Sequence, residues 1–463
     1  MSVASSYRND HQEMIPTREH RRFSHGTLFA PRPTEASSIS PEQALAHMIK
    51  VMMGTGMLSL PIAFKHSGLY LGMILLTFIC LICIYCTRQL VFAQHYVAHL
   101  KGQTRMDYAN VMRSAVEIGP PSVRGWGYFA KVTKYESGDL NAFLRQCVNI
   151  NMFVAQLGFC CVYFVFMADN LKQFFDQTSN IHISQAGWIG LLLVPLMALC
   201  TIRELKALAP LAGMANVLYL AAVVIVLYEI LQVERSTSEL PAFGDLASLP
   251  LFFGTVMFSF EGVAVVLPIE NQMDEPASFI SANGVLNTSC FLVLLLYIGV
   301  GFFGYLKYGA AVMDTITLNL PQSSFYQVIK LMFVCCILVS YPLQFYVPME
   351  RVEKWVHRKV AVEKQEKLIY GIRFLGVAFT CVMAQLIPHL ALFISLVGSV
   401  AGTSLTLVFP PLIELLCYYS KGTLTKWVWI RNIAIMLFSI VGFTTGTYAS
   451  LVQIVEAFGK SDV

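Results

Sequence analysis

The sequence predicts an all-α integral membrane protein that crosses the bilayer about eleven times. Its mean hydropathy is +0.61, and only 13% of its 463 residues are charged. Soluble domains carry roughly 25% charged residues, and a helix of about 20 apolar residues spans a bilayer. A soluble enzyme or a nucleic-acid partner is therefore not expected. The longest uncharged runs cover 69–87, 148–168, 187–201, 211–227, 291–305, 331–347 and 433–450.

Eleven helices account for the apolar pattern along the chain. A polar, Ser-, Pro- and Arg-rich segment, residues 1–43, precedes them and is expected to be a disordered tail. Residues 457–463 form a short end, and the transmembrane region covers 44–456. The expected helices are 44–67, 69–97, 143–171, 186–202, 208–231, 247–272, 282–306, 324–348, 367–387, 390–417 and 427–456.

Lysine and arginine gather in alternate loops, which predicts the side of the membrane that each loop occupies. They are dense in the tail and after the second, fourth, eighth and tenth helices. The opposite loops contain only Lys172, Arg235 and Lys307. The N-terminus is therefore expected in the cytosol and, after eleven crossings, the C-terminus outside the cytosol. A plasma membrane and a lysosomal or endosomal membrane both remain open.

Two of the expected helices are interrupted by glycine at comparable places. The first contains GTG at 54–56, within HMIKVMMGTGMLSLPIAF, and the sixth contains SFEG at 259–262, within FFGTVMFSFEGVAVVLPIE. Discontinuous helices in corresponding positions are typical of transporters built from inverted repeats, whose binding site lies at the breaks. Residues 44–231 and 247–417 would then form two five-helix halves, with 427–456 as an added helix. Close packing is the alternative explanation, because glycine and proline are common in membrane helices.

A broken helix frees backbone groups that lipid cannot satisfy. Amides at 56–59, at a positive helix end, suit a carboxylate, whereas carbonyls at 51–53 and 257–259 can accept from an ammonium group. A site that offers both suits the common part of an amino acid. The residues expected to bind substrate are Gly54, Thr55, Gly56, Met57, Ser259, Phe260, Glu261 and Gly262.

Several side chains near these breaks admit two interpretations. An ionised Glu261 at mid-membrane would be costly, so it binds either the coupled proton or the substrate amine; otherwise it is a neutral acid that bonds freed backbone. Histidine as a residue type changes charge near physiological pH, so His47 suits a proton relay, or it is an interfacial histidine. Phe260 could close over substrate or simply pack. Glu270 is expected to form a structural pair, with Lys50 as a candidate partner.

Five segments resemble the proton-coupled amino acid transporter family of the amino acid/auxin permease superfamily. They are HMIKVMMGTGMLSLPIAFKHSG, TIRELKALAPLAGMANV, FSFEGVAVVLPIENQM, SYPLQFYVPME and ISLVGSVAGTSLTLVFPPLIEL. The resemblance implies an amino acid-polyamine-organocation (LeuT-like) fold and symport of protons with glycine-, alanine- or proline-like substrates into the cytosol. It also links a histidine that opens the first helix, here His47, to proton coupling. Animal members commonly carry a disulfide between outer loops, and the corresponding 172–186 and 232–247 lack cysteine here.

The predicted function is therefore secondary active symport of protons and small neutral amino acids. No cofactor, metal or catalytic residue is expected, and GTGMLS lacks the lysine of a phosphate-binding loop. The alternative is an amino acid sensor or scaffold that signals through a cytosolic partner of residues 1–43. A channel would need a continuous polar pore or rings of charge, and no such pattern stands out in the sequence.

Overall fold

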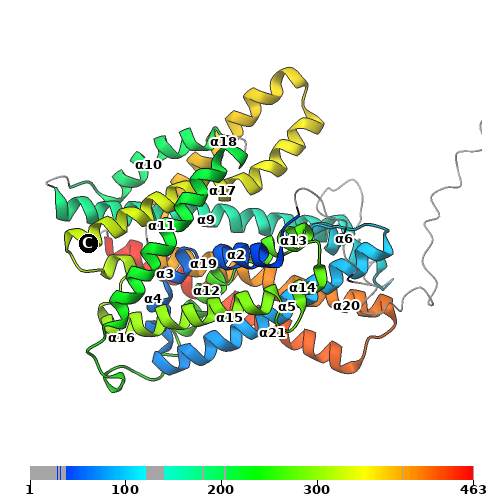
Figure 1. The fold of residues 1–463 in the computed structure, drawn as a ribbon, viewed down its shortest axis with the longest axis horizontal. Coiled ribbons are helices and arrows are strands. Elements are labelled where there is room, and N and C mark those ends of the chain that lie inside the picture. The colour runs from blue at the N-terminus through cyan, green and yellow to red at the C-terminus, as the bar shows by residue number, and fades with distance from the viewer. Residues whose placement is uncertain are drawn as a thin grey trace, which may run out of the picture.

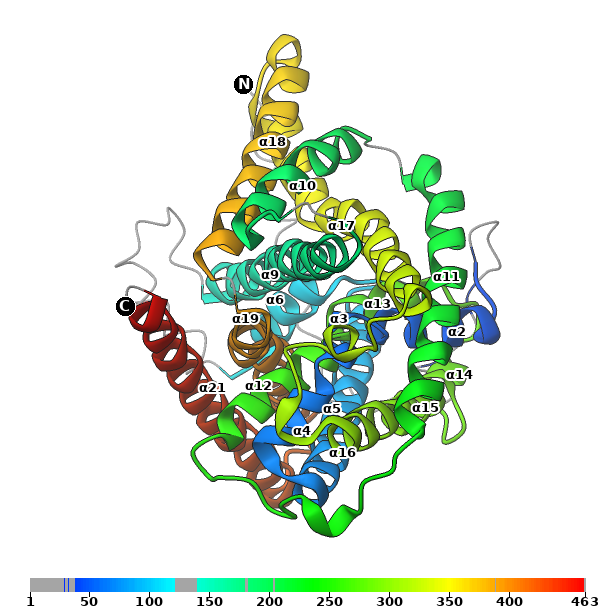
Figure 2. The same ribbon diagram turned by 90° about the vertical axis from the view of Figure 1, so that its left-hand side faces the viewer.

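The computed structural model describes residues 29, 32, 38–120, 140–179, 182–202, 205–387 and 389–461. Within these ranges the protein is almost entirely helical (Figures 1 and 2). Most of the predicted tail lies outside the described residues.

Nine helices in the described part of the chain are long and apolar enough to cross a membrane. Six are continuous: α5 (Leu69–Leu100), α9 (Leu140–Thr178), α11 (Leu205–Leu231), α17 (Ser324–Lys359), α18 (Val362–Leu386) and α21 (Lys426–Ser461). Three are composite: α12 (Leu249–Ser259) with α13 (Val263–Gln272), α15 (Val285–Ile298) with α16 (Gly304–Tyr308), and α19 (Leu390–Val397) with α20 (Phe409–Lys421).

The two remaining expected crossings are a short apolar helix and a broken one. The short helix is α10 (Gln185–Cys200), and the broken first helix consists of α2 (Pro41–Met52), α3 (Thr55–Leu58) and α4 (Leu60–Ser67). The predicted all-α membrane class is confirmed, and both predicted breaks are present, at 53–54 and 260–262.

The first helix begins three residues before its predicted start. Ser40 caps α2 by accepting from the Gln43 amide at 3.3 Å, and the Gln43 side chain accepts from the Ser40 amide at 3.1 Å. Pro41 occupies the first helical position, where its missing N–H does no harm. This reciprocal arrangement is a capping box, and SPEQ is its signature in the sequence.

An additional helix, α6 (Tyr108–Ile118), occupies part of the segment that we expected to be only a loop. Asp107 caps it by accepting from the Asn110 amide at 2.7 Å. The Tyr108 hydroxyl donates to the Leu405 carbonyl at 2.6 Å. The short apolar face of α6 therefore packs against the membrane helices instead of spanning the bilayer.

Helices α17 and α18 also extend beyond their predicted limits of 348 and 367. Figure 1 shows the hairpin between them projecting from the body of the molecule. Glu350 and Lys354 pair at 2.6 Å across one turn of this extension, a spacing that stabilises exposed helices. The charged sequence here ends the apolar span but not the helix.

The segment before α2 is tied to the end of α13. Arg32 pairs with Glu270 at 3.0 Å, and His95 of α5 lies 2.7 Å from the same carboxyl oxygen. The Ile39 amide donates to the Gln272 carbonyl at 3.0 Å. Glu270 is fully buried, and its partners are therefore Arg32 and His95 and not Lys50, which points elsewhere.

The broken helices lie between two groups of neighbours. Figure 2, which looks along the helices, shows α3 near the centre, with α9 and α17 on one side and α4, α15 and α16 on the other. Helix α2 packs on α15, α12 packs on α19 and α21, and α17 packs on α9 and α11. This arrangement leaves a space between α2 and the α9–α11–α17 group.

Candidate functional site

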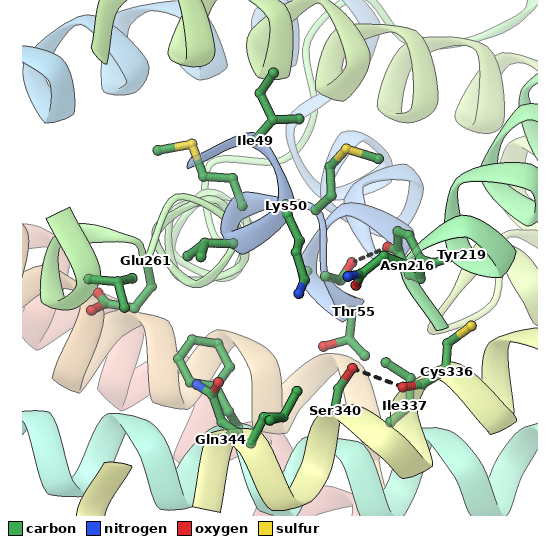
Figure 3. A pocket seen from close by; sticks show the side chains of 18 of the residues that line it. Ile49, Lys50, Thr55, Asn216, Tyr219, Glu261, Cys336, Ile337, Ser340 and Gln344 are labelled. Carbon is green, nitrogen blue, oxygen red and sulfur yellow. Dashed lines mark hydrogen bonds between the residues drawn. The ribbon is translucent and has the colours of Figure 1, made fainter. Parts of the chain in front are cut away.

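A cavity of about 750 Å³ adjoins both helix breaks. Its walls come from α2, α3, α9, α11, α12, the α12–α13 break, α13 and α17. Small-molecule sites are commonly about 300–1,000 Å³, mostly apolar, with a few placed polar groups. Figure 3 shows the polar side chains of this cavity.

The cavity is open at the end from which α2 begins. His47 and Lys50 line this end and are exposed, and Val347 of α17 also lines the cavity. At the other end, Thr55 and Ser259 are only 1% and 4% exposed. His47 lies seven residues before Gly54, or about 10 Å along a helix axis. It therefore sits near the mouth, and the breaks form the closed end.

Five of the eight residues predicted to bind substrate lie on this cavity. They are Gly54, Thr55, Gly56, Ser259 and Glu261.

The other three pack elsewhere. Met57 is fully buried in the core. The Phe260 ring packs on Tyr297 with centroids 5.0 Å apart, and Gly262 faces Met52. Whether any of the eight binds substrate stays a prediction.

The two glycines of the first break have different roles. A Cβ at Gly56 would lie 2.7 Å from Ser259 Oγ and 2.8 Å from Ser259 Cα. A Cβ at Gly54 would meet no atom within 4 Å, and its φ of −132° is open to any residue. Gly56 therefore lets the two broken helices touch, whereas Gly54 leaves room in the cavity.

Two tyrosines that we did not predict satisfy carbonyls freed by the breaks. The Tyr297 hydroxyl lies 2.5 Å from the Met52 carbonyl oxygen and 2.6 Å from that of Ser259. The Tyr219 hydroxyl donates to the Gly54 carbonyl at 3.1 Å. Part of the backbone expected to hold an ammonium group is thus already occupied. A buried tyrosine hydroxyl usually has a hydrogen-bond partner. This general rule was the only indication in the sequence that these two tyrosines bond the freed carbonyls.

The Glu261 side chain borders the cavity but turns away from it. Figure 3 shows its carboxyl pointing away from Lys50. Its Oε2 faces Gly402, where a Cβ would come within 3.3 Å. The residue is 8% exposed. The Thr406 hydroxyl lies near this carboxyl, yet neither carboxyl oxygen nor the Thr406 hydroxyl makes a hydrogen bond of good geometry with the described residues.

The wall that faces Glu261 is π-helical. Two π-helical segments, η7 (Gly398–Gly402) and η8 (Ser404–Val408), connect α19 to α20. Such segments occur frequently at functional sites. A buried carboxylate without partners is costly, so this environment favours the protonated acid, and the arrangement can hold a proton beside the cavity.

Three polar side chains of the cavity also escaped prediction. Lys50 extends from α2 into the cavity, and Asn216 of α11 lines it near Tyr219 (Figure 3). Gln156 of α9 also lines the cavity. A lysine near a glycine break in an apolar helix could have indicated a cavity residue from the sequence alone. A charge at that depth is costly unless it faces a polar cavity.

Comparisons with known proteins identify the family of this chain. Residues 37–454 match the family described as transmembrane amino acid transporter protein. The chain is 32% identical over 441 residues to the proton-coupled amino acid transporter-like protein pathetic of Drosophila melanogaster, covering 93% of this chain and 88% of that one. It is 26% identical over 450 residues to the probable amino acid transporter skat-1 of Caenorhabditis elegans, covering 94% of each.

Solved structures that the chain matches include MhsT in complex with L-phenylalanine, with a TM-score of 0.45 and 13% identity over 90% of this chain and 100% of that one. Another is the nucleobase-cation-symport transporter Mhp1, with a TM-score of 0.44 and 13% identity over 93% of this chain and 95% of that one. The family match covers nearly the whole described membrane region, and its members are named as carriers, not enzymes. The chain belongs to the transmembrane amino acid transporter family.

Proposed function

We propose that this protein is a secondary active transporter that carries small neutral amino acids into the cytosol together with protons. The observation that carries the proposal is the cavity at the two helix breaks, with the buried carboxyl of Glu261 beside it, which has no hydrogen bond of good geometry among the described residues. The cavity supplies a place for substrate, and the carboxyl supplies a place for a proton.

The chemistry of the cavity favours an amino acid with a small uncharged side chain. Polar groups gather at the break, where Thr55 and Ser259 lie, whereas Phe159, Phe258 and Ala264 provide apolar wall. An apolar wall accepts a small apolar side chain but offers no partner to a charged one.

The proton site in this proposal is Glu261, with His47 as a relay at the mouth of the cavity. A neutral Glu261 is compatible with its buried surroundings, and an ionised one is not unless the surroundings change. The proton would therefore bind and leave as the helices around the break rearrange.

Direction follows from the predicted orientation. With the N-terminus in the cytosol, the exposed mouth at His47 and Lys50 opens to the cytosol. In this proposal the described form is then inward-open, and 44–231 and 247–417 are the two repeats that exchange access. A plasma membrane and a lysosomal membrane both place the substrate source on the opposite side.

The available driving force is sufficient. One pH unit is worth about 1.4 kcal/mol, and 100 mV adds about 2.3 kcal/mol per charge. Together these could concentrate a neutral substrate several hundredfold, since every 1.4 kcal/mol corresponds to about tenfold.

Uptake into proteoliposomes tests the proposal. Radiolabelled alanine should accumulate when an inward acid gradient is imposed, and a protonophore should abolish the accumulation. Equal uptake with and without the gradient would show that transport is not coupled to protons. Absence of any alanine, glycine or proline uptake would contradict the substrate class.

A further inference from the structure

We propose that the Lys50 ammonium group binds the substrate carboxylate, and that Gln156 and Thr55 accept hydrogen bonds from the substrate ammonium group. This assignment rests on the proposed function, because it takes an amino acid as the substrate. It makes a free carboxylate, and not only a small side chain, the feature that the cavity selects.

Lys50 is placed to meet a ligand and not another part of the chain. It lies on α2, one turn before the break, and its side chain extends into the cavity between Glu261 and Asn216 (Figure 3). Among the described residues, no carboxylate pairs with its ammonium group, and Glu270, the candidate partner, pairs with Arg32. Because the Glu261 carboxyl points the other way, the positive charge in the cavity is left without a neutralising group.

A carboxylate on the ligand would neutralise this charge. The first turn of α3 also offers amides, but α3 has only four residues, so its helix dipole is small. The dipole of even a long helix amounts to about half a unit charge at its end, whereas the ammonium group carries a full unit and three donors. Lys50 is therefore the stronger partner for an anion in this cavity.

The acceptors for the ammonium group lie near the closed end. Thr55 is 1% exposed and Gln156 is 6% exposed, and neither Thr55 Oγ1 nor Gln156 Oε1 has a hydrogen-bond partner in the described part of the chain. Buried acceptors are normally satisfied. A ligand N–H group reaching the closed end would satisfy both.

Backbone acceptors are less available for this purpose. Tyr297 covers the carbonyls of Met52 and Ser259, and Tyr219 covers that of Gly54. An amino acid can thus lie with its carboxylate toward α2 and its ammonium group toward α3 and α9. Its side chain then faces the apolar wall, where Phe258 and Ala264 lie.

Binding of matched ligands to the purified full-length protein tests this orientation. L-Alanine and L-alaninamide differ mainly in the carboxylate, and L-alanine and propionate differ in the amine. Each dissociation constant is measured at one fixed pH by calorimetry, for the wild type, Lys50→Met and Lys50→Arg. Lys354→Met, on the projecting end of α17, is the matched control because this lysine is exposed and far along the helix from the cavity residues.

The wild type should prefer alanine over alaninamide, and Lys50→Met should lose this preference. We expect alanine to bind about tenfold more weakly, equivalent to about 1.4 kcal/mol, with alaninamide changed less than about twofold. Lys50→Arg should keep part of the preference, because it keeps the charge. Gln156→Leu should in turn reduce the preference for alanine over propionate.

A merely structural lysine would weaken all ligands alike, which the alaninamide measurement detects. Unchanged discrimination in Lys50→Met would overturn the assignment while leaving the proposed function intact. If the wild type binds neither alanine nor related amino acids, the proposed function fails instead. The two failures are therefore distinguishable.

Discussion

The Glu261→Gln variant should exchange amino acids across the membrane but should not accumulate them in response to a proton gradient. Glutamine reproduces the shape of a protonated carboxyl group but has no proton to release. The site can hold it, because Glu261 is 8% exposed and the nearby Thr406 hydroxyl has no hydrogen-bond partner of good geometry among the described residues. The variant is therefore expected to fold and to behave as a carrier fixed in the protonated form.

The magnitude follows from the driving force. For the wild type, one pH unit and 100 mV supply about 3.7 kcal/mol, which limits accumulation to several hundredfold. Without a proton to move, Glu261→Gln should equilibrate alanine to a ratio of about one. Exchange of external for preloaded alanine should stay within a few fold of the wild-type rate, because exchange needs no net proton movement.

The assay compares two transport modes in the same proteoliposomes: accumulation under a proton gradient, and exchange of external for preloaded alanine. Glu234→Gln, in the exposed loop after α11, provides the control for loss of a carboxylate elsewhere. If Glu261→Gln accumulates alanine to the wild-type ratio under an inward acid gradient, Glu261 is not the coupling acid. Loss of both modes with normal thermal stability would point to a substrate contact instead.

Three further predictions concern the breaks and the N-terminal segment. Gly56→Ala should lower the free energy of unfolding by about 1–3 kcal/mol, because the new methyl meets the Ser259 backbone. Gly54→Ala should leave the unfolding temperature almost unchanged and reduce binding of larger amino acids. Thermal unfolding in detergent checks the stability of both variants, and a substrate panel checks the binding. Tyr297→Phe removes the hydroxyl that bridges two freed carbonyls, and should cost about 1–3 kcal/mol in the same unfolding assay; an unchanged midpoint would contradict this role. Arg32→Ala leaves His95 as the one remaining ion-pair partner of the buried Glu270 among the described residues, and should cost about 3 kcal/mol, with Lys101→Met as a surface control.

The membrane class and the breaks could be predicted because their signals are local. Uncharged runs of sufficient length need no partner to be recognised, and glycines such as Gly54 and Gly56 weaken a helix through their own backbone freedom. The contrast between those two glycines could not be predicted, because it depends on Ser259, about 200 residues away in the chain. The same applies to Tyr297, whose hydroxyl meets carbonyls from both breaks.

The direction of the Glu261 side chain was also beyond the sequence. An acid beside a break suggests either a proton or an amine, and which of the two Glu261 binds stays a prediction. Gly402 leaves the space that the carboxyl occupies, and Thr406 lies close to it. Helix α6 was not predicted because its short apolar face, which includes Tyr108, is explained only by its packing against α9 and α20.

If Glu261 binds the coupled proton as proposed, its position connects proton binding to helix movement. It lies where α12, which packs against α19 and α21, meets α13, which packs against α2 and α5. Gly254 and Gly398 bring α12 and the start of η7 into close backbone contact, so these two elements have little freedom to separate at that level. Movement at the break would therefore take place mainly on the side of α13 and α2, and such movement would change the solvation of the Glu261 carboxyl. Because Lys50 lies on α2, the same movement would carry Lys50, the proposed partner of the substrate carboxylate, toward or away from the α9–α11–α17 wall. Substrate and proton would then respond to a single displacement without contacting one another.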